Sequence, residues 1–465
     1  MSLGLAGLSE LKSEPFKILW QHADIEYETA IAATAIVEKF IREKRLIVYG
    51  GGAIDGALRL KGSALYSDDL LADWDFFSPT NIEHAQDIAD ILFAAGFTET
   101  RALIGFHPTT MKVDASGLNH WVADISFCPR ALFDIIPTIE VDGILMVHPN
   151  YQRIDMHSAL SFPFDNAPRE VVFQRWARDI TRFNLLTSLY PIAAPTTPTT
   201  PVRLVETSTS LRKYVWNGFA AYALIYNHLL ANCGAQPIDA GIISAELAIS
   251  DTTISFPSIN NTFELIHYDL AKAQSRIGAP IIATTQPFGT IIPESISLSG
   301  AHRIDIYSTS DQMVSINEIT IGTTKFRTVN VQFLLKFFLA KYIATRTTQE
   351  KLASAYLGRY CSLLKMIEIA ERVVIERRVV AQESADEFMR ESPLFLSIYC
   401  YGFNNISTTD ARIINRLQVQ KHEKDVKVLK LPITYTPSKK APRPVYDYSH
   451  PLYATAGIIT SVSPK

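Results

Sequence analysis

The chain has 465 residues, 47% hydrophobic content, a formal net charge of −3 and four cysteines. Its length and apolar content suit about two or three domains with sizeable cores, and they exclude an intrinsically disordered protein. We recognise no secretory signal and no apolar run of about 18 residues, and the cysteines lack the CxxC spacing of zinc and redox sites. The composition therefore predicts a reduced, intracellular protein without a membrane span.

A glycine turn between a strand and a helix is the first motif that can carry chemistry. After a helix over residues 23–45, residues 46–49 are typical of a buried strand and residues 53–60 of a helix, with Gly50, Gly51 and Gly52 between them. Consecutive glycines leave backbone N–H groups accessible, and the N-terminus of a helix favours an anion. We therefore predict that Gly50 and Gly51 position phosphate groups.

Two carboxylates follow this turn on the next predicted strand, residues 73–77. Asp73 and Asp75 are two residues apart, so both side chains point to one face of a strand, with Cα atoms about 6.6 Å apart. Carboxylates this close repel each other unless a cation lies between them, and Mg²⁺ prefers oxygen ligands. The pair therefore predicts a site for a hard cation.

Asp124 offers the third carboxylate that two-metal phosphoryl transfer usually needs. It lies on a predicted strand at residues 122–127, whose hairpin partner is residues 109–113. A hairpin beside the strand of Asp73 and Asp75 would bring the three acids together. Taken alone, Asp124 also fits a solvated strand end.

The same stretch does not fit a dinucleotide-binding site. That fingerprint needs GxGxxG and a single acid about 20 residues later. Gly50 and Gly52 match the first two glycines, but Asp55 occupies the third position and the acid is doubled. The pattern favours metal-assisted phosphoryl transfer over hydride transfer.

Three basic residues and one histidine are weaker candidates around this site. Arg153 can bind a triphosphate because a guanidinium bonds phosphate with two N–H groups, and a structural salt bridge is the alternative. Lys112 and Lys61 are candidates of the same kind. His157 fits a hydrogen-bonded packing residue better than a contact to a base.

The alternation of strands and helices predicts an α+β fold with a mixed sheet and the acids at one edge. A connector with four prolines and four threonines separates the first domain from the rest of the chain. The first domain contains a helix over residues 81–95, a strand over 98–104 and a closing helix over 168–186, and the second opens with a helix over 210–232. The predicted division is 1–189 for an N-terminal helix and catalytic domain, 190–203 for the connector, 204–328 for a second α+β domain, 329–432 for a helical C-terminal region, and 433–465 for an irregular tail.

A basic stretch precedes the C-terminus. Residues 412–443 hold nine Lys and Arg against Glu423 and Asp425, a local balance of +7. Such a stretch can bind RNA phosphates, and a solvated surface segment is the equal alternative.

Several strings resemble a known family: YGG.AID.AL.LKGS, DWDFFSP, WVADIS, HP.YQR..MH.AL and SFPFDNAPRE. They are similar to the poly(A) polymerase catalytic subunits of large DNA viruses, within the DNA polymerase β-like nucleotidyltransferase superfamily. Among asfarviruses, mimivirus relatives and poxviruses, the asfarvirus form is the most similar. The resemblance covers residues 35–190 well. The serine that often follows the first glycine of the turn in the wider superfamily is replaced by glycine here.

The resemblance implies a template-independent polynucleotide adenylyltransferase that adds AMP from ATP to RNA 3′ ends. Asp73, Asp75 and Asp124 would hold two Mg²⁺ or Mn²⁺ ions, and Gly50, Gly51, Lys112 and Arg153 would contact the nucleotide. It also implies a homodimer, or a heterodimer with a processivity or cap methyltransferase subunit. The expected location is the viral factory in the host cytoplasm, or the virion.

Two alternatives stay open within this superfamily. A terminal transferase with another base specificity, of the uridylyl or CCA type, would carry the same motif. A catalytically silent RNA-binding fold is disfavoured because three repelling carboxylates would have no purpose in it. Residues 303–308, RIDIYS, resemble residues 73–78 with Arg in place of the first acid. This indicates either a degenerate nucleotidyltransferase-like second domain without a metal site or an unrelated α+β domain.

Overall fold

Residue contacts divide the protein into two compact units, each built from several chain segments. The first unit comprises residues 1–152, 182–191 and 417–456, and the second comprises residues 153–181, 192–416 and 457–465. Whereas the sequence predicts domains that follow one another, these units interleave along the chain. The computed structural model describes residues 24–68, 73–105, 109–115, 121–161, 169–195, 203–239, 249–285, 294–308, 316–380, 434–439, 442–443 and 448.

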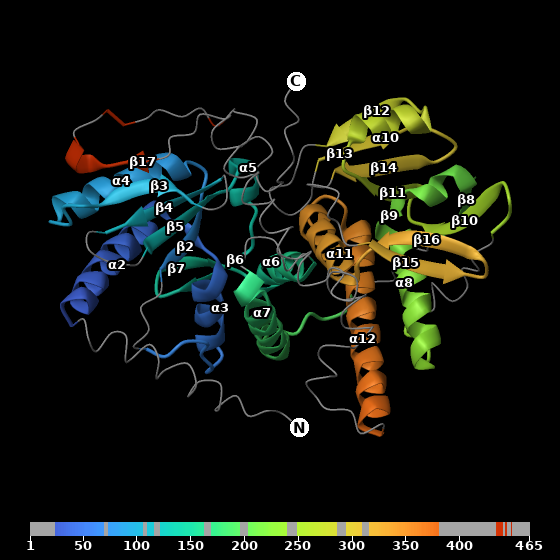
Figure 1. Cartoon of the computed structure of the whole chain (residues 1–465), viewed down its shortest axis with the longest axis horizontal. Helices are drawn as coiled ribbons and strands as arrows, with labels where there is room; N and C mark the ends of the chain where they lie inside the picture. Colours follow the sequence, from blue (N-terminus) through green and yellow to red (C-terminus); the bar gives the residue numbers. More distant parts are fainter. Residues whose placement is uncertain are drawn as a thin grey trace. The chain divides into compact units, whose positions relative to one another are not determined.

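The first unit is built on an eight-stranded sheet with the order β17-β3-β4-β5-β2-β1-β7-β6 (Figure 1). Strands β1 and β7 are parallel, as are β2 and β5, whereas the other neighbours are antiparallel. The prediction of a mixed sheet is confirmed. The strands are β1 (Ile47–Val48), β2 (Trp74–Ser78), β3 (Arg101–Ile104), β4 (Thr110–Asp114), β5 (Trp121–Phe127), β6 (Thr138–Val141), β7 (Ile144–Val147) and β17 (Thr434–Tyr435).

Helices cover this sheet with their apolar sides. Helix α4 (Asn81–Ala94) buries Ile82, Ala85, Ile88 and Leu92, a spacing of three and four residues that places them on one side of the helix. Helices α2 (Asp24–Lys44) and α4 pack against each other and both contact β5, so they form one layer. Helix α3 (Gly50–Arg59) contacts β2, β6 and β7. The short helix α5 (Arg130–Phe133) follows β5.

The second unit contains a seven-stranded sheet with the order β12-β13-β14-β11-β9-β16-β15. Taken in this order, its strands correspond to β3, β4, β5, β2, β1, β7 and β6 of the first sheet. Neighbouring pairs run in the same relative direction in both sheets, including the parallel pairs β11–β14 and β9–β16. The strands are β9 (Val215–Trp216), β11 (Thr262–His267), β12 (Ile281–Thr285), β13 (Ser295–Leu298), β14 (Arg303–Ser308), β15 (Ile316–Ile321) and β16 (Thr324–Val329).

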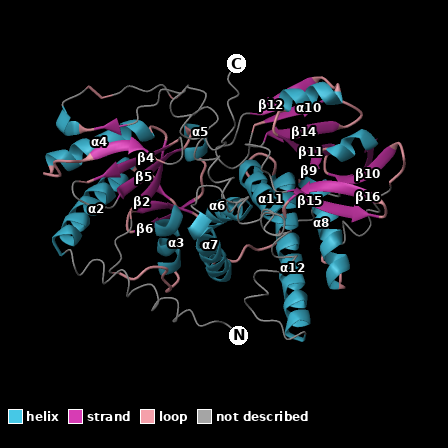
Figure 2. Ribbon diagram, in the orientation of Figure 1, coloured by secondary structure: helices cyan, strands magenta, loops and turns pink. Residues whose placement is uncertain are grey.

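The helices of the second unit supply most of its core. Helix α8 (Gly218–Cys233) is buried on nearly all sides, with Phe219, Tyr222 and Tyr226 among its buried aromatics. The other elements are α6 (Pro149–Ser161) and α7 (Arg169–Leu189), each of which continues from one unit into the other, α10 (Leu270–Ile277), α11 (Val331–Thr345), α12 (Glu350–Val380) and a separate ribbon of β8 (Arg203–Ser208) and β10 (Thr253–Ser258). Figure 2 shows the sheets in magenta among helices in cyan. None of the helices within the described residues has the length and apolar character of a membrane span.

Two predicted boundaries are wrong in an informative way. The helix predicted over residues 210–232 begins only at Gly218, after a 3₁₀ turn (Thr209–Lys213) and the short strand β9. Val215 and Trp216 instead form β9, which pairs with β11 and β16. These tertiary contacts override the local helix propensity. The three glycines, predicted as a turn before the helix, instead form the first residues of α3.

The described C-terminal residues, 434–439, 442–443 and 448, form a strap on the first unit. Strand β17 pairs with the edge strand β3, and the Tyr435 hydroxyl donates to Asp90 at 2.7 Å. Arg443 pairs with Asp87 and Asp90. The Tyr448 ring stacks on Phe127 at 5.3 Å. Arg443 of the predicted basic stretch thus forms ion pairs within the first unit. Apart from the exposed Lys439, the other basic residues of that stretch lie outside the described residues.

We expect truncation after residue 433 to expose the β3 edge and to destabilise the first unit by about 2–4 kcal/mol, because it removes buried aromatic contacts and a strand pairing. Hydrogen exchange of the Ala102 and Leu103 region, measured by mass spectrometry, should accelerate. The control R443Q removes only half-exposed ion pairs and should cost about 0.5–1 kcal/mol. Unchanged exchange in β3 after truncation would contradict a stabilising role for the strap.

Candidate active site

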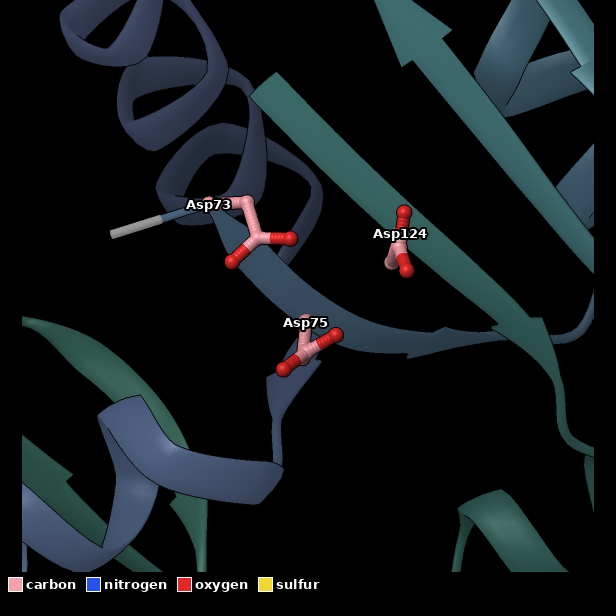
Figure 3. Close-up of side chains that lie close together, drawn as sticks. All are labelled: Asp73, Asp75 and Asp124. Carbon is pink, nitrogen blue, oxygen red and sulfur yellow. The ribbon is translucent and has the colours of Figure 1, made fainter. Parts of the chain in front are cut away.

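Three carboxylates meet at the start of β2 and in the middle of β5. Asp73 directly precedes β2, Asp75 lies within it, and Asp75 is paired with Asp124 in the parallel register of β2 and β5. One carboxylate oxygen from each residue lies within 4.8 Å of the other two, and Figure 3 shows the three side chains turned toward one another. The structure therefore brings together the three acids that the sequence predicts as metal ligands.

The electrostatics of this cluster fit a divalent cation. Burial, together with the charges of Asp73 and Asp124, raises the pKa of Asp75 to about 8. Burial also raises the pKa of Asp124, against the opposing effect of Lys112. Asp124 Oδ1 is buried and accepts no hydrogen bond from any described residue. Half-buried, mutually repelling oxygen donors, one of them without a hydrogen bond from the described residues, are the donor set that Mg²⁺ or Mn²⁺ would satisfy.

The glycines of α3 lie directly against this cluster. The Tyr49 amide donates to the Asp75 carbonyl at 2.9 Å, which holds the start of α3 beside β2. Gly50 has φ +69°, and a Cβ there would lie 2.8 Å from Asp75 Oδ2. A side chain at residue 50 is therefore excluded both by the backbone conformation and by the acid. The first amides of α3 have no partner within the helix, so this terminus can bind an anion beside the three candidate metal ligands.

Lys112 reaches the cluster from β4. Its Nζ lies 2.8 Å from Asp124 Oδ2 and 5.1 Å from the centre of the Trp121 ring. Both partners of the ion pair are largely buried, with side-chain exposures of 21% and 17%. Lys112 thus sits at the predicted site, where it offsets part of the acidic charge; its predicted contact to the nucleotide stays a prediction.

Two residues of this neighbourhood were not predicted from the sequence. Arg182 Nη2, from α7, donates to the Tyr66 hydroxyl at 2.6 Å, and its charge lowers the pKa of Asp75. The Tyr66 hydroxyl lies so close to Gly51 that a Cβ there would be 2.2 Å from it. Arg182 lies 107 positions after Asp75 in the sequence, and no local pattern connects them. The one available signal, an arginine on the apolar side of an amphipathic helix, is weak by itself.

Two of the remaining predicted residues belong to the second unit. Arg153 belongs to the second unit, where it is buried near Tyr360 and Cys361 and where burial lowers its pKa. Its contact to a triphosphate stays a prediction. His157, also in the second unit, forms hydrogen bonds with Gln332 at 2.7 Å and Tyr360 at 2.9 Å. Burial lowers the pKa of His157 to about 4, so it is a neutral packing residue, as its sequence context favours.

Lys61 lies at the surface of the first unit. Its Nζ is 5.2 Å from the centre of the Tyr190 ring, and the residue is exposed. This placement fits a solvated lysine that packs on an aromatic ring.

The second sheet repeats this geometry with different side chains. Asn217 donates to the Glu264 carbonyl at 2.9 Å, as Tyr49 does to Asp75, and Gly218 has φ +58° where Gly50 has +69°. Glu264 pairs with Asp305 in parallel register, as Asp75 pairs with Asp124. The RIDIYS segment therefore corresponds to β5, and the match of this segment to residues 73–78 is wrong.

No acid occupies the second-sheet position that corresponds to Asp73. Two positions before Glu264 lies Thr262. Asp305 is bound by Arg303 Nε and by the Ser297 hydroxyl, each at 2.7 Å. Within the described residues, the only group of three candidate metal ligands is the one in the first unit.

Comparisons with known proteins identify one family to which this chain is similar. Residues 35–166 match the family described as the poly(A) polymerase catalytic subunit. Proteins assigned as that subunit in African swine fever virus are 33% identical over 77% of this chain and 74% of the Tick/Malawi protein, and 31% identical over 82% of this chain and 80% of the Badajoz protein. The assigned Acanthamoeba polyphaga mimivirus subunit is 29% identical over 35% of this chain and 27% of its own length.

A solved structure has the same fold. The Megavirus polyadenylate synthase is similar with a TM-score of 0.65 over 94% of this chain and 87% of that chain. At 17% identity, this similarity concerns the fold alone.

The glycines of α3 allow a matched test. G51A should displace Tyr66 and destabilise the first unit by about 1–3 kcal/mol, because its Cβ would overlap the tyrosine hydroxyl. In G52A the nearest atom to the new Cβ is Val48 Cγ1 at 3.8 Å, an ordinary contact. G52A should therefore be neutral or stabilising by up to about 1 kcal/mol. Equal unfolding free energies in urea for the two variants would contradict the packing of Tyr66 on Gly51.

The raised pKa of Asp75 predicts how stability depends on pH. Between an ordinary aspartate pKa and about 8, the folded, metal-free protein binds more protons at Asp75 than the unfolded chain does. Its stability should therefore fall as pH rises from 5 to 8, by at most about 1.4 kcal/mol per pH unit from this group. Thermal unfolding in chelator should show this slope, and D75N should flatten it. Mg²⁺ or Mn²⁺ at pH 8 should stabilise the wild type more than D75N, and a slope unchanged in D75N would contradict the assignment.

Proposed function

Because the chain belongs to the family of poly(A) polymerase catalytic subunits, we propose that its first unit adds AMP from ATP to RNA 3′ ends at Asp73, Asp75 and Asp124. The protein is a viral poly(A) polymerase, an enzyme whose substrates are RNA and a nucleotide. The observation that supports this location is the meeting of three carboxylates beside the N-terminus of α3.

The residues of the first unit fit the requirements of nucleotidyl transfer. Asp73, Asp75 and Asp124 would hold two Mg²⁺ or Mn²⁺ ions, which when bound lower the pKa of the RNA 3′-hydroxyl and neutralise the departing pyrophosphate. The amides of Gly50 and Gly51 bind and orient the triphosphate at the start of α3. Lys112, against Asp124, limits the repulsion between the acids and the incoming phosphates.

We further infer that the second unit is a degenerate nucleotidyltransferase-like fold without a metal site. Strand order, strand direction and the glycine at the helix start support this reading. The absence of a metal site is supported by the loss of the first acid, because Thr262 occupies the position that corresponds to Asp73. Its role would be to support RNA binding or assembly.

The proposals for the oligomeric state and the cellular location of the enzyme rest on its family relationship. We propose a homodimer, with a heterodimer that includes a processivity or cap methyltransferase subunit as the alternative. We also propose that the enzyme acts in the viral factory of the host cytoplasm or in the virion. Light scattering of the purified chain would test the dimer directly.

Extension of a labelled RNA primer, with each of the four nucleotides offered separately and Mg²⁺ or Mn²⁺ present, tests the function. We expect a ladder with ATP alone, and its loss by at least about a thousandfold in D73A, D75A and D124A, because metal ligands act as a unit. The matched control is D305N beside D124N: each replaces the acid at the corresponding position of β14 or β5 by its isosteric amide, and only D124N should abolish extension.

Other outcomes of this assay identify the alternatives. A ladder with UTP or CTP would retain the chemistry and overturn the choice of base. No extension by a folded protein that binds RNA would favour the silent RNA-binding fold.

A further inference from the structure

A buried guanidinium lies beside the glycine turn of the first unit. Arg182, in α7, is 9% exposed, and its Nη2 donates to the Tyr66 hydroxyl at 2.6 Å. Its Cζ lies 5.9 Å from the centre of the Tyr66 ring, so the guanidinium also contacts the aromatic group. A guanidinium with so little solvent around it attracts an anion more strongly than an exposed one does.

The position of Tyr66 places this charge at the start of α3. The Tyr66 hydroxyl would be 2.2 Å from a Cβ on Gly51, and Gly50 is in similar contact with Asp75 Oδ2. Gly50 and Gly51 are adjacent residues, so the acid cluster and the Arg182–Tyr66 pair flank the same helix terminus. A group bound to the amides of that terminus would lie between the metal ligands and the guanidinium.

The loop that carries Tyr66 is held in place by polar contacts to α3. Asp55, on α3, accepts from the Leu65 amide at 2.6 Å and from the Tyr66 amide at 3.0 Å. Arg59 donates to Asp55 at 2.6 Å and to the Tyr66 carbonyl at 2.9 Å. The helix that binds the anion therefore also fixes the loop that orients Arg182.

The charges of the site explain why a fixed cation is needed there. A triphosphate brings several negative charges next to three carboxylates, and metal ions held by those carboxylates would offset only part of the combined charge. A guanidinium on the other side of the helix terminus can bond the outer phosphates with two N–H groups. The Tyr66 hydroxyl would hold it in that orientation.

We propose that Arg182 binds the β- or γ-phosphate of the incoming nucleoside triphosphate, and that Tyr66 is its positioning residue. This inference rests on the proposed function of the first unit. It implies that Arg182 also binds free pyrophosphate, since pyrophosphate consists of those two phosphates. In the reverse reaction, pyrophosphate attacks the terminal phosphodiester, so that ATP forms and the RNA is one residue shorter.

The test compares R182Q, R182K and Y66F in the full-length protein, with steady-state kinetics in both directions. In R182Q, the KM for ATP and the KM for pyrophosphate should both rise about tenfold to a hundredfold, as expected for a lost charge-assisted hydrogen-bonded contact. The KM for RNA should stay unchanged. R182K should recover part of the loss, and Y66F should raise the two phosphate KM values less than R182Q does.

R178Q is the matched control. Arg178 lies one turn earlier on α7, is exposed, and pairs with the neighbouring Asp179 at 3.2 Å. Its loss should leave all three KM values unchanged. If R182Q does not fold, R182K and Y66F still decide the question through the same two phosphate KM values.

The outcomes separate this inference from the proposed function. A wild type that extends RNA, with R182Q and Y66F unchanged in the KM for ATP and for pyrophosphate, would overturn the role of Arg182 alone. An equal rise in the KM for RNA would indicate a general structural role and would also overturn it. A wild type that extends no RNA would overturn the proposed function itself.

Discussion

The parallel pairing of β2 with β5 is the constraint on which the site depends. It sets Asp75 opposite Asp124, and the alternation of side chains along β2 adds Asp73 on the same face. The hydrogen bond from the Tyr49 amide to the Asp75 carbonyl then attaches the start of α3 to the same strand. Backbone contacts thus place three acids and one helix terminus side by side.

The second unit shows what the same backbone does when the side chains change. Glu264 stands where Asp75 stands in the first sheet, and its additional methylene carries the carboxylate to the Phe219 amide of α8, at 3.3 Å. The Tyr356 hydroxyl donates to the other carboxylate oxygen at 3.4 Å. In the second unit the chain's own carboxylate thus occupies the helix terminus, and Arg303 neutralises Asp305. The two sheets share a fold and differ in the ligands that they can accept.

The parts of the site that depend on local pattern could be predicted from the sequence. Asp73 and Asp75 are two residues apart on a strand, and the glycines precede a helix, so spacing alone indicates their chemistry. Arg182 and Tyr66 meet only through the packing of α7 and a loop, and no spacing rule relates them. Residues 303–308, RIDIYS, were matched to the wrong strand for the same reason. A short sequence shows how side chains alternate along a strand, but it does not show where that strand lies in a sheet.

The strap has a consequence for the synthesis of the protein. The last strand of the first unit's sheet, β17, follows all the described residues of the second unit in the chain. The first unit's sheet therefore emerges from the ribosome with the edge strand β3 unpaired. The described residues of the second unit are translated before β17 can pair with that edge. A nascent chain interrupted before residue 434 keeps all three acids of the cluster yet carries an unpaired strand edge, which is a template for aggregation. Completion of the first unit's sheet thus requires translation to continue past the described residues of the second unit.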